Sequence, residues 1–172
     1  MVNIITGNVN QGKTRYMRSL YEKRGGDGFI CAKVFDKNNF QGYDLVRLRT
    51  GKSTPFVRKN DAIPGDWDEM YRFGIFSFSG YAFTVADRII AEIIEDGTEP
   101  IFIDEVGPLE IVEQKGFYKL LKRVLKLNRE VYISIRNELV NELIKEFKIN
   151  EPQIIRLLPD VFDTPITRSK IK

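Results

Sequence analysis

Apolar residues occur along this chain either in short uninterrupted runs or at helical spacing, and the two patterns alternate. Residues 2–6 form a short run rich in β-branched residues without a polar face, which predicts a strand covered on both sides. Residues 13–24 follow with apolar positions on one helical stripe, and the pair Gly25-Gly26 marks the end of that helix. The chain is therefore predicted to begin with a buried strand, a short loop and an amphipathic helix.

The next fifty or so residues differ, because β-rich segments follow one another with no helical spacing between them. Asn38-Asn39 is predicted to be a hairpin turn, and residues 59–72, which contain Pro64-Gly65, are predicted to form a loop. The predicted strands of this region are 28–36, 42–50, 52–58 and 74–79. Strands joined by short turns pair antiparallel, so we expect an antiparallel β insertion around residues 28–79.

Alternation of helix and strand resumes near residue 81. The predicted helices are 81–96, 117–127 and 137–147, the last with Asn137 as N-cap, and the predicted strands are 100–105, 131–135 and 153–158. Residues 159–172 are polar and weakly patterned, which predicts a loosely packed tail. The whole pattern predicts one α/β domain over residues 1–172, with a mostly parallel central sheet flanked by helices.

Composition limits the functions open to the chain. Of its 172 residues 42% are hydrophobic and 30% charged, and the formal net charge of +3 does not indicate nucleic-acid binding. No apolar run could span a bilayer and no N-terminal targeting segment is recognisable, so we expect a cytoplasmic protein with no membrane partner. One cysteine, Cys31, suits a reducing compartment, and the absence of histidine leaves catalysis to other groups. The oligomeric state stays open.

A glycine-containing loop, TGNVNQGKT, joins the first strand to the first helix. It matches G-x-x-x-x-G-K-[ST] in the strand–loop–helix context that this phosphate-binding pattern requires. Its N–H groups and the helix N-terminus would hold phosphates, Lys13 would reach the β- and γ-phosphates, and Thr14 would coordinate Mg²⁺. The predicted nucleotide-binding residues are Gly7, Asn8, Val9, Asn10, Gln11, Gly12, Lys13, Thr14 and Arg15. The alternative is a strand–helix turn with an incidental Lys-Thr.

Two adjacent acids, Asp104 and Glu105, end the predicted strand 100–105. Ligands of open α/β sheets bind at the carboxyl ends of the strands. Asp104 is therefore a candidate Mg²⁺ ligand, as in a Walker B motif, and Glu105 is a candidate catalytic base that polarises water for attack on the γ-phosphate. For the pair taken alone, exposed acids at the start of a turn are the alternative. Glu110 and Glu113 are interpreted as solvated loop charges, and the alternative is that they are secondary acids near the site.

Arg136 follows the predicted strand 131–135, at the same edge of the sheet. It could neutralise transition-state charge as an internal arginine finger, which makes it a candidate catalytic residue with Lys13 and Glu105. The alternative, which the sequence alone favours, is a solvated arginine before a helix. A basic run at residues 119–129 has no interleaved aromatic residues and is interpreted as a solvated helix face.

Together these segments resemble the THEP1 family of P-loop nucleoside-triphosphatases, which are small RecA-like domains. The matching segments are TGNVNQGKT, the middle pair Gly28-Phe29 with residues 42–48, and IDEVGPLE at residues 103–110. The resemblance covers about residues 1–150. It implies Mg²⁺-dependent hydrolysis of nucleoside 5′-triphosphates to diphosphates, with relaxed base choice and modest turnover.

The loop departs from the family pattern at Asn8, Asn10 and Gln11, and at Arg15, where the family usually has a second threonine. Asn tolerates left-handed backbone, so these changes bear on rate and nucleotide preference more than on phosphate binding. Two other functions stay open. The chain could be a kinase whose acceptor, such as a nucleoside, binds the 28–79 segment, or a slow nucleotide-dependent switch. It has no N-K-x-D string, which argues against a conventional guanine-specific switch.

Overall fold

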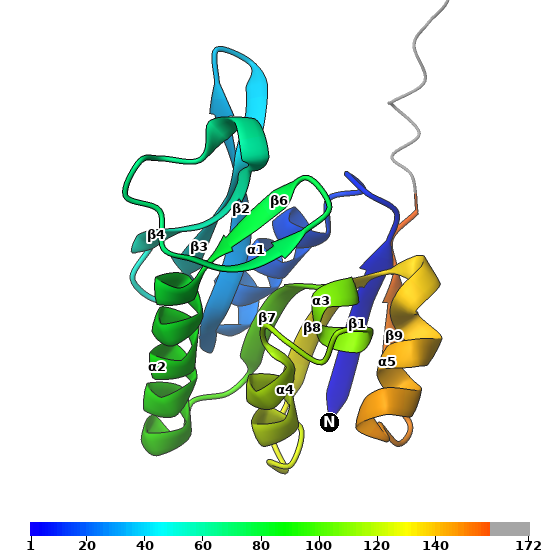
Figure 1. Cartoon of the computed structure of the whole chain (residues 1–172). Coiled ribbons are helices and arrows are strands. Elements are labelled where there is room, and N and C mark those ends of the chain that lie inside the picture. The colour runs from blue at the N-terminus through cyan, green and yellow to red at the C-terminus, as the bar shows by residue number, and fades with distance from the viewer. Residues whose placement is uncertain (159–172) are drawn as a thin grey trace, which may run out of the picture.

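Nine strands form one mixed sheet with helices on both faces in the computed structural model, which describes residues 1–158 (Figure 1). The strands are β1 (Val2–Gly7), β2 (Asp27–Asp36), β3 (Asn39–Arg47), β4 (Ser53–Lys59), β5 (Glu69–Phe73), β6 (Phe76–Ser79), β7 (Ile101–Val106), β8 (Val131–Arg136) and β9 (Gln153–Arg156). The α-helices are α1 (Lys13–Arg24), α2 (Gly80–Asp96), α3 (Pro108–Ile111), α4 (Tyr118–Val124) and α5 (Val140–Phe147), with 3-10 turns η1 (Asn60–Ala62) and η2 (Asn137–Leu139). The predicted tail, 159–172, lies outside the described residues.

The sheet has a parallel half and an antiparallel half that meet at β2. Its strand order is β5-β6-β4-β3-β2-β7-β8-β1-β9. From β2 to β9 all four pairings are parallel, and from β5 to β2 all four are antiparallel. The predicted α/β class and the antiparallel region are confirmed. The prediction of a mostly parallel sheet overestimates the share of parallel pairings, which is half, because the antiparallel strands extend the same sheet.

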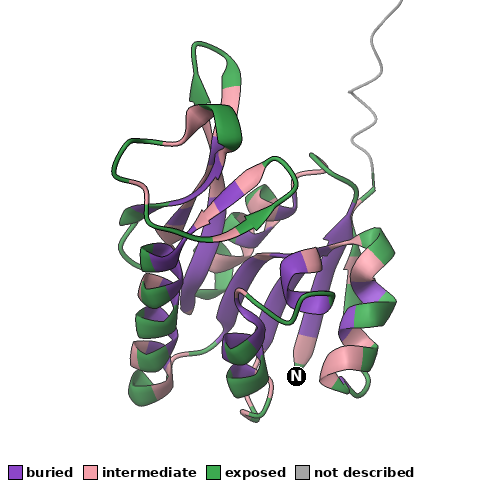
Figure 2. Ribbon diagram, viewed as in Figure 1, coloured by how far each residue is buried: buried purple, intermediate pink, exposed green. Residues whose placement is uncertain are grey.

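Helices cover the two faces unequally (Figure 1). On one face α1 packs alone, and Met17 lies in a small cluster with residues such as Phe102 and Tyr132. On the other face α2, α4 and α5 cover a larger core that includes Phe56 and Phe117. Figure 2 shows that burial is concentrated in the central strands and that the tip of the β2–β3 hairpin is exposed. None of the helices in residues 1–158 is long and apolar enough to cross a membrane.

Two local features of the antiparallel half differ from the prediction. The segment predicted as a loop, 59–72, contains η1 and most of β5, which pairs with β6. The indole N–H of Trp67 donates to Ser77 Oγ (2.8 Å), a bond across 10 residues that sequence periodicity cannot show. The hairpin turn lies at Lys37-Asn38, one residue earlier than predicted, and both residues have positive φ (43° and 72°), as two-residue hairpin turns require.

In the C-terminal part, the predicted helix 137–147 is a 3-10 turn, η2, followed by α5. Asn137 does not act as the N-cap of α5, whose cap is Leu139, because its side chain bonds elsewhere. The predicted helix 117–127 is shortened to α4, and the short helix α3 was not predicted. These errors lie at helix ends and short elements, where local patterns are weakest.

Candidate active site

The glycine-containing loop folds as the motif requires. β1 ends at Gly7 and α1 begins at Lys13, so residues 8–12 form the connection. Gly12 precedes α1 with φ 78°, a left-handed conformation that glycine adopts at no steric cost. Asn10 is also left-handed, with φ 67°, which confirms that asparagine at this departure from the family pattern suits the loop. The loop N–H groups therefore lie at the N-terminus of α1, where an anion is stabilised.

Lys13 lies across this loop and not in solvent. The residue is only 5% exposed, and its Nζ donates to the carbonyl oxygens of Gly7 (3.1 Å) and Asn8 (2.9 Å). An ammonium group has three donors, and the two bonds to the loop fix where its charge lies. A buried cation held beside the loop at the N-terminus of α1 is suited to bind phosphate oxygens.

Side chains from distant segments hold the loop in place. Asn137 accepts from Thr6 Oγ1 (2.9 Å) through Oδ1 and donates through Nδ2 to Asn8 Oδ1 (3.0 Å). Lys33, on β2, donates to Asn10 Oδ1 (2.6 Å). The sequence gives no signal for these roles, because the partners of Asn137 lie about 130 residues earlier in the chain. Only the parallel pairing of β1 with β8 brings them together.

Asp104 is fully buried and bonded to the phosphate loop's helix. Its Oδ2 accepts from Thr14 Oγ1 (2.8 Å) and from the backbone N–H of Cys31 (3.0 Å), and its Oδ1 accepts from Ser134 Oγ. Burial raises the pKa of Asp104, and the three hydrogen bonds oppose this shift. The alternative of exposed acids is therefore wrong for Asp104.

The backbone is distorted at Glu105, so its side chain is directed differently from that of Asp104. The β7–β8 register shifts between Ile103 and Val106, and Glu105 has φ 58°, which is uncommon for a residue with a side chain. Its N–H donates to Ser134 Oγ (2.9 Å) instead of to the strand ladder. Burial and the charge of Asp104 raise the pKa of Glu105, while nearby cations, Lys13 first, oppose the rise.

The predicted site residues surround one cavity of about 370 Å³. Its lining comprises Val9, Asn10, Gln11, Gly12, Lys13, Thr14, Arg15, Arg18, Cys31, Lys33, Tyr43, Glu105 and Arg136. Gly7, Asn8 and Asp104 are not in this lining; Gly7 and Asn8 hold Lys13, and Asp104 lies behind Thr14. The geometry thus gathers the loop, the hydroxyl, the acid and the arginine around one space.

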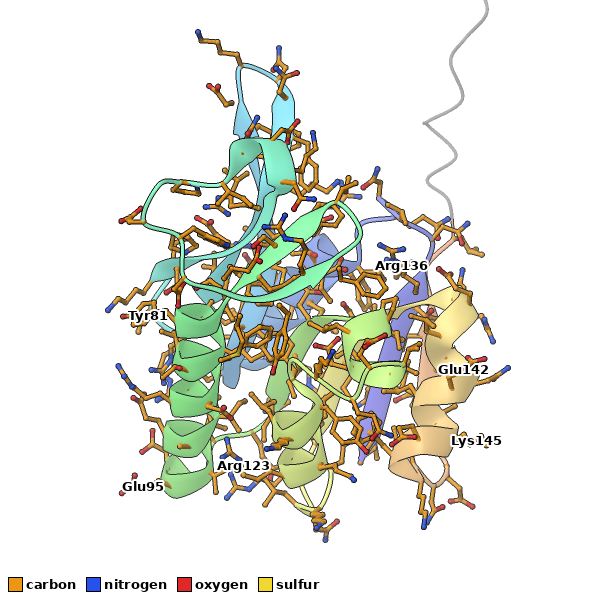
Figure 3. The ribbon with its side chains drawn as sticks, in the orientation of Figure 1. Tyr81, Glu95, Arg123, Arg136, Glu142 and Lys145 are labelled. Atoms are coloured by element: carbon orange, nitrogen blue, oxygen red, sulfur yellow. The ribbon has the colours of Figure 1, made fainter. Side chains whose placement is uncertain are left out.

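Arg136 is half-buried at the end of β8, opposite Gly7 in the β1–β8 register. Figure 3 shows it at the carboxyl edge of the sheet. Because it lines the cavity, the interpretation as a wholly solvated arginine does not describe its position. Its place beside Glu105 is instead compatible with contact to a bound phosphate.

The sequence of this chain is similar to those of known nucleoside-triphosphatases. A family model described as NTPase matches residues 3–161. The chain belongs to this NTPase family. It is 27% identical over 168 residues to Nucleoside-triphosphatase THEP1 of Aquifex aeolicus (strain VF5), with 91% of this chain and 90% of the relative covered. The predicted resemblance to THEP1-type nucleoside-triphosphatases is confirmed.

Solved structures share the fold of this NTPase. The crystal structure of THEP1 from Aquifex aeolicus matches with a TM-score of 0.72 and 24% identity, over 92% of this chain and 91% of that one. The solution structure of a human cancer-related nucleoside triphosphatase matches with a TM-score of 0.61 and 18% identity, over 90% and 87% of the two chains. Both likenesses support the predicted P-loop α/β architecture.

One acid of this NTPase was misinterpreted from its sequence. Glu110 is 4% exposed, and its carboxylate accepts from the N–H groups of Gly107 (3.0 Å) and Phe117 (3.0 Å). Burial raises its pKa to about 7 although both N–H bonds oppose the shift. The interpretation as a solvated loop charge is therefore wrong for Glu110, whereas Glu113 is exposed as predicted. The signal was its spacing, because a Glu three residues after the N-cap can accept from the N-cap N–H, as Glu110 does from Gly107.

Proposed function

We propose that this NTPase hydrolyses nucleoside 5′-triphosphates to the diphosphate and phosphate, in the cytoplasm and with Mg²⁺ as cofactor. The observation that carries the proposal is the 2.8 Å bond between Thr14 and Asp104, which joins the phosphate loop to the acidic strand across 90 residues. Membership of the NTPase family supports hydrolysis as the reaction. The proposed roles of individual residues follow from their positions.

Phosphate binding is assigned to the loop and to Lys13. Backbone N–H groups between Gly7 and Lys13 would bond the β-phosphate, and the Lys13 ammonium group would contact β- and γ-phosphate oxygens. Arg15, next to Thr14 on the first turn of α1, lines the same cavity and adds positive charge on this side.

The residues around Thr14 fit a Mg²⁺ ion. Mg²⁺ takes oxygen ligands, keeps several waters, and is commonly held by one or two protein groups together with substrate phosphates. Thr14 lines the cavity and its hydroxyl donates to Asp104, which is not in the lining, so Thr14 would be a direct ligand and Asp104 would act through water. Bound there, Mg²⁺ would neutralise the charge of the β- and γ-phosphates.

Glu105 and Arg136 are assigned to the attack on the γ-phosphate. Glu105 lines the same cavity as the loop, and its carboxylate would accept a proton from the attacking water there. Arg136 would stabilise the negative charge of the transferring phosphoryl group, and its planar fork suits two phosphate oxygens. The distorted backbone of Glu105 stores strain at the position where the chemistry needs a fixed carboxylate.

Phosphate release from ATP, GTP, CTP and UTP, with and without Mg²⁺, tests the reaction. Glu105→Gln keeps the side chain's shape and loses its basicity, so we expect nucleotide binding to persist while turnover falls about 100-fold or more. Lys13→Ala should instead weaken nucleotide binding itself. Glu113→Gln, at an exposed acid outside both cavities, is the matched control and should keep the wild-type rate. Wild-type turnover in Glu105→Gln would refute its role. Formation of the nucleoside diphosphate only after an acceptor is added, with the phosphoryl group on the acceptor and no free phosphate, would indicate a kinase.

A further inference from the structure

A second and larger cavity, of about 720 Å³, adjoins the phosphate site. The two share seven lining residues: Val9, Asn10, Cys31, Lys33, Tyr43, Glu105 and Arg136. They therefore form one continuous hollow with two chemically different ends. Lys13 and Thr14 line only the first cavity, whereas a group of aromatic residues lines only the second. Its volume falls within the range of small-molecule sites.

The position of Glu105 shows which side of the phosphates the second cavity occupies. In phosphoryl transfer the attacking oxygen and the leaving oxygen lie on opposite sides of the γ-phosphorus. The phosphate loop and Lys13 hold the leaving diphosphate, so Glu105 lies on the side of the attacking oxygen. Glu105 lines the second cavity, whereas Lys13 and Thr14 do not, and neither do Arg15 and Arg18 further along α1. It therefore lies beyond the γ-phosphate, on the side opposite the base of the bound nucleotide.

The walls of the second cavity are built largely by the antiparallel half of the sheet. Phe40 packs against Phe35 (ring centroids 5.8 Å apart), Tyr43 (5.1 Å) and Phe76 (6.3 Å), so the β2–β3 hairpin contacts the β5–β6 hairpin. At the rim, Phe35 and Ile75 are 56% and 58% exposed. Large apolar side chains left exposed around a hollow indicate a surface that a ligand covers. Aromatic walls suit a flat aromatic ligand, which stacks on them.

We propose that this aromatic cavity is the site of a second ligand, a planar aromatic molecule of about nucleoside size that carries a hydroxyl group. The aromatic part lies against Phe40 and Tyr43, and the hydroxyl group lies beside Glu105, where the attacking water lies during hydrolysis. The proposal rests on the proposed function for the placement of the γ-phosphate. Its consequence is that the ligand lowers phosphate release without displacing the nucleoside triphosphate.

Uncharged nucleosides are suitable probes, because they have an aromatic base and hydroxyl groups but no phosphate. Adenosine, guanosine, cytidine and thymidine would each be titrated into the protein with saturating ATP and Mg²⁺, with ribose as the non-aromatic control. We expect at least one nucleoside to lower the maximal rate of phosphate release at unchanged KM for ATP, and ribose to have no effect. A calorimetric titration of the same nucleosides without ATP measures binding even if hydrolysis is absent, so failure of the proposed function is distinguished from failure of the cavity.

A pair of variants locates the binding. Phe35→Ser removes a ring from the rim, and we expect about tenfold weaker nucleoside binding. Tyr81→Ser removes a ring of the same 56% exposure from the start of α2, outside both cavities, and should leave nucleoside binding and phosphate release unchanged (Figure 3). Because both side chains are exposed, neither variant removes core packing.

Several outcomes would decide the proposal. Transfer of the γ-phosphoryl group to the nucleoside would support it, since this requires the same placement: the hydroxyl oxygen bonds to phosphorus, the bond to the leaving diphosphate breaks, and the hydroxyl proton passes to Glu105. A nucleoside that raises the KM for ATP at unchanged maximal rate would lie in the phosphate site and would overturn the proposal. So would calorimetric silence of all four nucleosides, equal binding by both variants, or a dimer that only Phe35→Ser dissociates.

Discussion

The two halves of the sheet contribute different kinds of side chain to the hollow at its edge. In the parallel half, crossover connections bring the ends of β1, β7 and β8 to one edge, and these ends carry the loop, the acids and Arg136. In the antiparallel half, hairpins follow one another and present aromatic side chains, such as Phe40 and Phe76, beside the same edge. The comparison indicates that the parallel strands supply the polar chemistry and that the antiparallel strands supply the apolar wall beside it.

The largest expected effect is in the parallel half, at Arg136. Arg136→Ala should lower kcat about 1000-fold with little change in KM, because an arginine finger acts mainly in the transition state. Arg136→Lys should recover only part of the rate, since an ammonium group lacks the planar fork. Steady-state phosphate release measures both. A loss of less than tenfold in the alanine variant would refute the role of Arg136 as an arginine finger.

In the antiparallel half, we expect substitutions of buried residues to lower the free energy of unfolding. Phe56 is 4% exposed, and its ring lies 5.2 Å from that of Phe83, 5.3 Å from that of Phe117 and 5.8 Å from that of Phe78. Phe56→Ala should lower the free energy of unfolding in urea by about 3–5 kcal/mol, because it leaves a cavity among these rings. Phe35→Ala, at an exposed ring in the same half, should change it by less than about 0.5 kcal/mol. Similar losses in the two variants would contradict the view of Phe56 as core.

A smaller effect is expected at Glu110, in the short helix α3 that follows β7. Its folded pKa of about 7 is above the unfolded value of ~4.3, so the folded state favours the protonated acid. The stabilisation is complete below the unfolded pKa and is lost as pH rises through 7, by up to about 3 kcal/mol. Urea unfolding at pH 5 and pH 8 should show wild type losing stability relative to Glu110→Gln over this interval. A difference that does not change with pH would show that Glu110 stays ionised in the fold.

The parallel half was the easier half to predict from the sequence. Its strands are buried runs separated by amphipathic helices, and its chemistry lies in contiguous segments such as residues 6–14 and 103–105. Local spacing was therefore enough to identify Lys13 and Glu105 as candidates. The rule that strands of α/β sheets bind ligands at their carboxyl ends supplied the rest.

The parts that escaped prediction depend on contacts between distant residues. Ser134 donates to Asp104 and accepts from Glu105, about 30 residues away, yet it is one small polar residue in a buried strand. Asn137 fits an N-cap by local rules, and only the β1–β8 pairing shows that it holds the loop. In the antiparallel half, β5 follows a segment with Pro64-Gly65, and its pairing with β6 outweighs these turn signals.

The hydrogen bond from the backbone N–H of Cys31 to the Asp104 carboxylate has a mechanical consequence. Cys31 belongs to β2, and two and four residues further along the same strand Lys33 and Phe35 line the aromatic cavity. The same strand thus holds the buried carboxylate through Cys31 and lines the aromatic cavity a few residues further along. A ligand that displaces β2 at the aromatic cavity would therefore lengthen or bend the hydrogen bond from Cys31 to Asp104. Binding in the aromatic cavity would in this way alter the position of the carboxylate behind the phosphate site.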